Sequence, residues 1–287
     1  MQLTRQAGGA RALLDASLPG QAVGLAWLGQ AGFALRHAGR RWLIDPYLSD
    51  HLARKYAGTE FAHRRMMPPP VNADEIRDLD LVLCSHRHGD HTDPGLLPTL
   101  AASNPGCRFV VPRAEFQFAA DLGLPAARLL PANDGDTIPV SDAIAIHVLP
   151  SAHETLKANE RGEHHFLGFI LKLGGLTLYH SGDCVVYDGL AERLRSWRID
   201  LALLPVNGRH ASLASRGIAG NMNFDEASNL CLAAGIGALV PHHFGMFAFN
   251  TVDPAELERR AAGSGPGLRC LLPSAREFFV FTPAMAP

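Results

Sequence analysis

The sequence predicts a layered α/β protein in which helices cover the faces of a β-sheet. Short apolar runs typical of buried strands alternate with segments of helical length, as where residues 81–84 precede residues 94–102. The chain has 287 residues, of which 47% are hydrophobic and 19% charged, which is enough to bury a substantial core. We therefore expect one globular domain over residues 1–287.

Composition also limits which classes of partner and which cell compartment fit this chain. The formal net charge of -2 provides no basic field for phosphates, so nucleic acid is not expected as the main partner. Residues 1–20 lack the apolar core of a signal peptide, and no later run has the length of a membrane span. The five cysteines are scattered without a Cys-x-x-Cys pair, which fits a reducing cytoplasm. We expect a soluble cytoplasmic protein.

The first third of the chain reads as strands followed by an irregular segment. Residues 23–28, 33–35 and 42–44 form a predicted antiparallel meander that ends at Asp45-Pro46. Asp45 suits either a turn or a partner that orients a metal-bound histidine. Residues 50–75, with three consecutive prolines, predict an irregular insertion that serves as a lid or as a subunit contact in a homo-oligomer.

The remaining elements alternate strand and helix and deliver polar residues at strand ends. We expect strands at residues 81–84, 108–111, 144–150, 166–173, 176–179, 201–206, 238–241, 268–272 and 278–281. We expect helices at residues 94–102, 113–122, 224–234 and 254–262.

The stretch from Ser85 to Asp93 contains the densest group of residues that can bind metal ions. His86 and His88 share one face of an extended segment, and the following turn directs Asp90 and His91 to a second centre. The alternative to a metal site is a histidine-rich loop that is exposed to solvent and has no binding role. Imidazole nitrogens and carboxylates are, however, the ligands of zinc and related ions, so the spacing favours two adjacent metal ions.

Three later strands also end in ligand-type residues. His153 follows the strand at 144–150, and Asp183 follows the strand at 176–179 across a glycine turn. His242 or His243 follows the strand at 238–241. A buried carboxylate is tolerable beside positive charge, so Asp183 is the expected bridge between two cations. Polar ligands at the ends of several apolar strands predict a metal site at the edge of a sheet.

With these residues in hand, the sequence resembles the metallo-β-lactamase-fold hydrolases. The likeness rests on His86-x-His88-x-Asp90-His91, His153, Asp183 in Ser-Gly-Asp, and His243 two residues after Pro241. It implies a four-layered αβ/βα sandwich with two mixed β-sheets flanked by helices. It also implies that His86, His88 and His153 hold one ion, that Asp90, His91 and His243 hold the other, and that Asp183 lies between them.

Two branches of that superfamily are similar to this chain. Residues 179–183 (Tyr-His-Ser-Gly-Asp) and 241–243 (Pro-His-His) resemble the L-ascorbate-6-phosphate lactonase-like branch, which implies a lactone or ester substrate and raises manganese as an alternative to zinc. Residues 241–248 also resemble the N-acyl-phosphatidylethanolamine-hydrolysing phospholipase D, which implies a phosphodiester substrate.

We therefore expect a metal-dependent hydrolase in which a hydroxide bridged by two divalent ions opens a lactone or cleaves an ester of a small anionic substrate. Imidazole-rich coordination favours zinc. Asp90 is the expected proton acceptor as well as a ligand. His165, Arg209 and Asn223 are candidate substrate contacts, against the alternative that Arg209 is a solvated loop charge and that asparagine turns hold the loop. A phosphodiesterase and a non-catalytic metal-binding protein are the competing functions.

Overall fold

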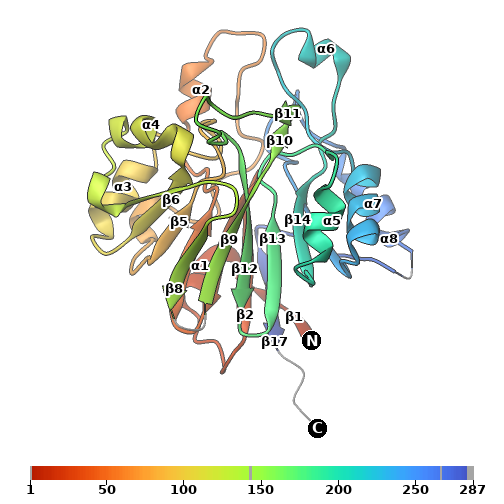
Figure 1. Ribbon diagram of the computed structural model, residues 1–287, viewed down its shortest axis with the longest axis horizontal. Helices are drawn as coiled ribbons and strands as arrows, with labels where there is room; N and C mark the ends of the chain where they lie inside the picture. Colours follow the sequence, from red (N-terminus) through yellow and green to blue (C-terminus); the bar gives the residue numbers. More distant parts are fainter. Residues whose placement is uncertain (1, 142–143, 266, 283–287) are drawn as a thin grey trace.

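Two mixed β-sheets lie face to face, and helices cover the outer side of each sheet (Figure 1). This computed structural model describes residues 2–141, 144–265 and 267–282. Each sheet has an antiparallel half and a parallel half. The expected four-layered α/β sandwich with two mixed sheets is therefore confirmed.

The first sheet has eight strands in the order β1-β17-β2-β3-β4-β5-β6-β7. Its strands are β1 (Gln2–Ala7), β2 (Val23–Gly29), β3 (Gly32–His37), β4 (Arg40–Ile44), β5 (Leu81–Leu83), β6 (Arg108–Pro112), β7 (Leu129–Ala132) and β17 (Glu277–Thr282). Neighbours are antiparallel from β1 to β4 and parallel from β4 to β7.

The second sheet has seven strands in the order β16-β15-β14-β13-β12-β9-β8. Its strands are β8 (Thr137–Ser141), β9 (Ile144–Pro150), β12 (Leu167–Leu173), β13 (Leu176–His180), β14 (Leu201–Pro205), β15 (Ala238–His242) and β16 (Arg269–Cys270). The short strands β10 (Ala152–His153) and β11 (Thr155–Leu156) form a separate two-stranded ladder above it.

Most of the helices lie on the two outer faces and complete the layers. The helices are α1 (Gly9–Asp15), α2 (His51–Lys55), α3 (Leu97–Ser103), α4 (Phe116–Asp121), α5 (Leu190–Arg195), α6 (Ala211–Ala214), α7 (Phe224–Ala234) and α8 (Pro254–Ala262), with 3-10 turns at Ala73–Glu75, Arg113–Glu115 and Ala126–Arg128. Apolar residues of α1, α3 and α4 pack on the first sheet, and those of α5, α7 and α8 pack on the second.

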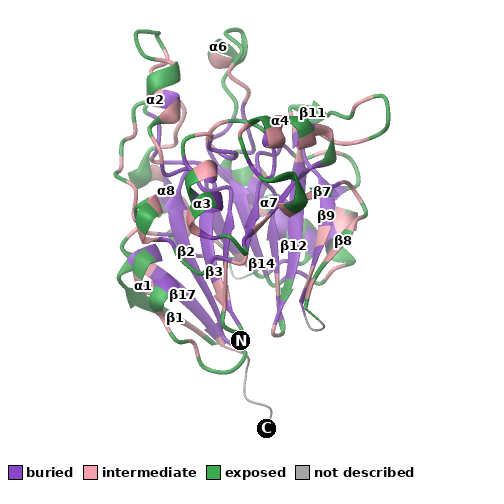
Figure 2. Ribbon diagram, turned by 90° about the vertical axis from the view of Figure 1, so that its left-hand side faces the viewer, coloured by how far each residue is buried: buried purple, intermediate pink, exposed green. Residues whose placement is uncertain are grey.

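Strand β2 shows why the sequence forms layers. Val23, Leu25 and Trp27 contribute to the core between the sheets, whereas Ala26 and Leu28 belong to the core under α1. Successive side chains of a strand point to opposite faces, so a strand that is apolar throughout must be covered on both sides. Figure 2 shows the result, with buried strands at the centre and exposed helices and loops around them.

The structure also contains elements that the sequence did not predict. Strand β1 and helix α1 occupy residues 2–15, and β1 pairs with β17, with Gln2 opposite Thr282. The segment from residue 50 to 75 is irregular as expected apart from α2 and a 3-10 turn. Among the described residues, no helix combines the length and the hydropathy needed to span a membrane.

The ligand-type residues all lie at one end of the sandwich. The loops that follow β4, β5, β9, β13 and β15 open at the end of the molecule where α2, α6 and β10 lie, at the top of Figure 1. The carboxyl ends of parallel strands meet at the same edge of a sheet, so the topology gathers these loops.

Candidate metal centre

The loop after β5 presents its side chains through a tight reversal of the chain. The backbone N–H groups of His91 and Thr92 both donate to the carbonyl of His88, at 2.9 and 2.8 Å. The hydroxyl of Thr92 donates to the carbonyl of His86 at 2.6 Å. These bonds fold residues 86–92 back on themselves. His86 and His88 thereby join one group of potential ligands, and Asp90 and His91 join another.

Two groups of potential ligands meet at this edge, and the ligand atoms within each lie no more than 4.8 Å apart. We call His86, His88 and His153 the first cluster and Asp90, His91 and His243 the second cluster, with Asp183 shared between them. Asp183 groups with the first cluster by distance. All the side chains expected to be ligands are thus brought together.

Asp183 lies between the clusters, with Oδ1 toward the second and Oδ2 toward the first. Its Oδ1 is 3.2 Å from Nε2 of His91 and 3.4 Å from Nε2 of His243. Its Oδ2 is 3.9 Å from Nε2 of His153. This is the placement that a bridging carboxylate requires.

The turn before Asp183 depends on Gly182. Gly182 has φ +60°, and an added Cβ there would lie 2.6 Å from Cβ of Ser85. Its N–H donates to Nδ1 of His180 at 3.0 Å, while Nε2 of His180 donates to the carbonyl of Ala31 at 2.8 Å. Buried His180 therefore orients the turn that presents Asp183.

The unsatisfied atoms of this centre fit a cation. Nε2 of His91 and Oδ1 of Asp183 are buried 3.2 Å from each other, and neither makes a well-aligned hydrogen bond within the part of the chain that the structure describes. Buried polar atoms without partners are costly and rare in native proteins. Both atoms face the same space, and imidazole nitrogen with carboxylate oxygen is a donor set that suits zinc and related divalent ions.

Asp45 holds the second cluster from behind. Its Oδ2 accepts a hydrogen bond from Nδ1 of His91 at 2.7 Å, which leaves Nε2 of His91 free to face the centre. The hydroxyl and the backbone N–H of Ser85 also donate to Asp45, at 2.5 and 2.7 Å. Of the two interpretations of Asp45, the structure supports a partner that orients a histidine.

Burial and charge give the histidines of the two clusters opposite protonation tendencies. Burial lowers the pKa of His86 and His88, and it lowers the pKa of His153 to about 4. Burial also lowers the pKa of His91 and His243, but the carboxylates around them, Asp183 first, outweigh it and raise the pKa of both. The first cluster therefore offers neutral imidazoles, which is the form that binds metal.

The carboxylates at the centre are ionised. Burial raises the pKa of Asp183 and Asp90, but His243 and His91 outweigh it and lower both pKa values. Cys184, next to Asp183, remains a thiol because burial raises its pKa to about 12. A thiolate nucleophile is therefore not available at this position.

A cavity of about 1150 Å³ opens onto the two clusters. His88, His153, Asp90, Asp183 and His243 line its floor. Its walls come from distant segments, among them His51–His63 with α2, residues 154–157 around β11, and residues 216–219 after α6. The insertion at residues 50–75 thus forms part of the cavity wall.

The three expected substrate contacts do not line this cavity, because each side chain is engaged elsewhere. Asn223 caps helix α7, where its Oδ1 accepts a hydrogen bond from the backbone N–H of Glu226 at 2.9 Å. Arg209 pairs with Glu226 and donates to the carbonyl of Asn221 at 3.1 Å. His165 pairs through Nδ1 with Oε1 of Glu115 at 2.5 Å.

Residues in three loops contribute to the site without having been expected there. Gln30, in the turn between β2 and β3, directs its amide at Asp90 and His243. Tyr56 and Phe247 line the cavity from segments far apart in sequence. An uncharged amide or a single aromatic residue forms no spaced motif that could be recognised in the sequence. The Asn223-x-x-Glu226 pattern, in contrast, is a sequence signature of a capping box.

Comparison with known proteins places this arrangement in a family. Residues 40–244 match the model of the beta-lactamase superfamily domain. A UPF0173 metal-dependent hydrolase of Caldivirga maquilingensis is 25% identical over 247 residues, which cover 85% of this chain and 92% of that protein.

Solved structures share the fold. Igni18, a metallo hydrolase from Ignicoccus hospitalis, matches with a TM-score of 0.66 and 19% identity, over 92% of this chain and 100% of that one. The isothiocyanate hydrolase from Delia radicum gut bacteria matches with a TM-score of 0.69 and 17% identity, over 89% and 98% of the two chains. Since the family model spans residues 40–244, well over half of the sequence, this chain belongs to the beta-lactamase superfamily and has the metallo-β-lactamase fold.

Proposed function

We propose that this chain is a metal-dependent hydrolase that opens a lactone or cleaves an ester of a small anionic substrate. The observation that carries the proposal is the pair of clusters that share Asp183 at the floor of one cavity. In the proposal, His86, His88 and His153 hold one divalent ion, Asp90, His91 and His243 hold a second, and Asp183 touches both. When bound, such ions lower the pKa of water and polarise a carbonyl or phosphoryl oxygen.

Asp90 is the proposed proton acceptor. It faces the cavity, and the lowered pKa of its carboxyl keeps it ionised near neutral pH. It can accept the proton that attacking water loses and return it to the leaving oxygen, so that the elements of water are added across the cleaved bond. Replacing it with asparagine keeps the shape but removes the base, and we expect kcat to fall about 10²–10⁴-fold.

Cations around the cavity support an anionic substrate. Lys55, Arg87, Lys157 and Arg216 all line it. Arg216 pairs with Glu60, and Arg87 lies 3.8 Å from Glu115, whereas neither lysine has an ion-pair partner among the described residues. Unpaired positive charge at a cavity mouth attracts anions and raises their local concentration.

Two neighbouring residues of α2 provide a matched test of the anionic substrate. Lys55 and Arg54 are both exposed, but only Lys55 lines the cavity. We expect Lys55→Ala to raise KM for an anionic substrate about 3- to 10-fold at low salt, with a smaller effect at high salt, because surface electrostatics are screened. Arg54→Ala should leave KM unchanged. Equal effects of the two variants would remove the argument for a cationic wall.

The experiment that tests the whole proposal combines metal analysis with a substrate panel. Protein purified without added metal is analysed for its ions, stripped with a chelator and reconstituted with zinc or manganese. The imidazole-rich first cluster favours zinc, with manganese as the alternative. Sugar-acid lactones, carboxylic esters and bis-aryl phosphates are then compared at equal metal loading. We expect turnover of lactones or esters that disappears on stripping and returns on reconstitution.

Each other outcome has a defined meaning. Full activity in the stripped protein contradicts a metal-dependent mechanism. Rates on phosphodiesters far above those on lactones assign the chain to the phosphodiesterase alternative. Two bound ions without turnover of any substrate in a broad hydrolase panel leave a non-catalytic metal-binding protein.

A further inference from the structure

The turn between β2 and β3 brings a neutral residue to the second cluster. Gln30 has φ +50°, a conformation that non-glycine residues seldom adopt, and it is fully buried. Its carbonyl oxygen accepts hydrogen bonds from Nε1 of Trp27 and from the backbone N–H of His243, both at 2.9 Å. The turn is thus fastened to the residue after β15, and strained residues of this kind concentrate at functional sites.

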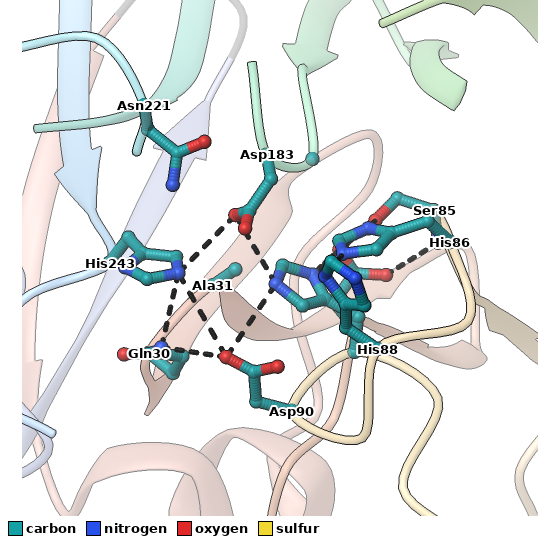
Figure 3. A network of polar contacts seen from close by, with 12 residues as sticks. Gln30, Ala31, Ser85, His86, His88, Asp90, Asp183, Asn221 and His243 are labelled. Atoms are coloured by element: carbon teal, nitrogen blue, oxygen red, sulfur yellow. Dashed lines mark hydrogen bonds and ion pairs between the residues drawn. The ribbon is translucent and has the colours of Figure 1, made fainter. Parts of the chain in front are cut away.

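The Gln30 amide lies against two members of the second cluster (Figure 3). Its Nε2 is 2.8 Å from Oδ2 of Asp90 and 3.1 Å from Nε2 of His243. Its Oε1 is buried and has no hydrogen-bond partner in the described part of the chain. Nε2 of this amide therefore lies close to two possible ligand atoms, whereas Oε1 makes no hydrogen bond within the described part of the chain.

A cation bound in the second cluster would favour the opposite orientation of the Gln30 amide. Turning the amide by 180° exchanges its oxygen and nitrogen, and the two orientations differ only in which atom faces Asp90 and His243. With a cation bound, the lone pair of Nε2 of His243 is occupied, and an N–H group pointing at the ion is repelled. The amide oxygen, in contrast, is a suitable donor for a divalent cation.

The spacing also suits a ligand. Two ligand atoms at adjacent corners of an octahedron with bonds of about 2.1 Å are separated by about 3.0 Å. The inward-facing atom of the Gln30 amide lies 2.8 and 3.1 Å from its two neighbours, which brackets this value. The second cluster then offers Asp90, His91, His243, the shared Asp183 and one neutral oxygen.

We propose that Gln30 is a further metal ligand, which turns its amide oxygen to the divalent cation held by Asp90, His91 and His243. The inference rests on the metal binding in the proposed function but not on any substrate. It adds a neutral oxygen to the cluster that already contains Asp90, so the second position should tolerate manganese better than the first does.

Two substitutions of similar size separate this role from the alternative in which the amide only donates a hydrogen bond to Asp90. Gln30→Glu can bind a cation but cannot donate, and Gln30→Met can do neither. If the oxygen is a ligand, we expect Gln30→Glu to bind Mn²⁺ or Co²⁺ in the second cluster at least about tenfold more tightly, and Gln30→Met about 10- to 100-fold more weakly. Affinities are measured by competition with a chromogenic chelator.

Cobalt provides a spectroscopic signature that does not depend on turnover. Loss of one ligand lowers the coordination number, so Gln30→Met should give stronger visible absorption for the second Co²⁺ equivalent than the parent protein. His88→Asn is the matched control, since it should weaken the first equivalent and leave the spectrum of the other intact. Circular dichroism and thermal unfolding of the metal-free variants check that the turn still folds.

The outcomes distinguish the inference from the proposed function. If Gln30→Glu weakens the second equivalent as Gln30→Met does, the amide acts as a donor to Asp90 and the ligand role is overturned. Unchanged affinity and spectrum in Gln30→Met overturn it as well. A parent protein that binds no divalent ion contradicts the proposed function itself.

Discussion

The two clusters share one carboxylate but are built differently. The first cluster consists of imidazoles whose pKa values are lowered, and one of them, His86, has its Nδ1 3.0 Å from the hydroxyl of Ser85. In the second cluster, Asp45 bonds to His91, while Gln30 contacts Asp90 and His243. Its imidazoles have raised pKa values because carboxylates surround them.

This difference predicts that the two clusters respond differently to pH and to substitutions nearby. Neutral imidazoles bind a cation without first losing protons, so the first cluster should retain its ion over a wide pH range. The second cluster has more negative charge, but protons compete for its histidines. We infer that the first position is filled more readily in acid and that the second is more sensitive to changes in the residues behind it.

Removal of the shared charge should have the largest effect. Asp183→Asn keeps the size of the side chain but removes the negative charge that faces both clusters. We expect activity to fall on the order of 10³-fold and both ions to bind more weakly, because each position loses the same carboxylate. Metal content after dialysis, together with kcat/KM, provides the measurement. Loss of one ion alone would show that Asp183 serves a single cluster.

A change behind the second cluster should affect that cluster most. Asp45 has φ +43°, which asparagine tolerates well, so Asp45→Asn removes charge with little backbone cost. We expect the affinity for the second ion to fall about 10- to 100-fold while the first is retained. Isothermal titration with Zn²⁺ resolves the two equivalents. Equal weakening of both would contradict the assignment of Asp45 to His91.

Acidification should release the two ions in sequence. A raised pKa means that His91 and His243 take up protons at a higher pH than ordinary histidines, so protons displace the second ion first. The lowered pKa of His86, and that of about 4 for His153, keep the first cluster unprotonated until the pH is well below the usual histidine range. Elemental analysis of samples equilibrated at decreasing pH should show one ion lost before the other. Simultaneous release would remove the distinction between the clusters.

The smallest effect is expected away from both clusters. Asn223→Ala removes the cap of α7 and should lower the free energy of unfolding by about 1 kcal/mol, measured by urea denaturation. Metal content and KM should not change, because Asn223 does not line the cavity. A rise in KM without loss of stability would instead restore the expectation that Asn223 contacts substrate.

The sequence predicted the fold class and the positions that meet at the centre, for a physical reason. Apolar strands and the polar residues at their ends are local patterns, and His86, His153 and Asp183 each follow such a strand. Their role as ligands stays a prediction. Asp45 could be placed at a strand end, but its partner could not be read from sequence because Ser85 and His91 lie 40 or more positions away.

Other features depend on contacts that no local pattern carries. Arg209 stands beside the ligand-bearing strands in sequence, yet its charge is directed to Glu226 on the following helix. Gln30 reaches the centre from the β2–β3 turn, which is hydrogen-bonded to the distant His243. Lys55 and Tyr56 line the cavity because an irregular segment folds over it, and irregular segments have no periodicity from which to predict a position.

The position of β17 has a consequence for how the chain folds as it is synthesised. This last strand inserts between β1 and β2, the first two strands of the chain. Until residue 282 has left the ribosome, β1 has no neighbour and one long side of β2 is open. The first sheet therefore cannot be completed in order from the N-terminus. Until β17 is synthesised, the nascent chain exposes an unpaired strand edge that is prone to aggregation and that chaperones can cover.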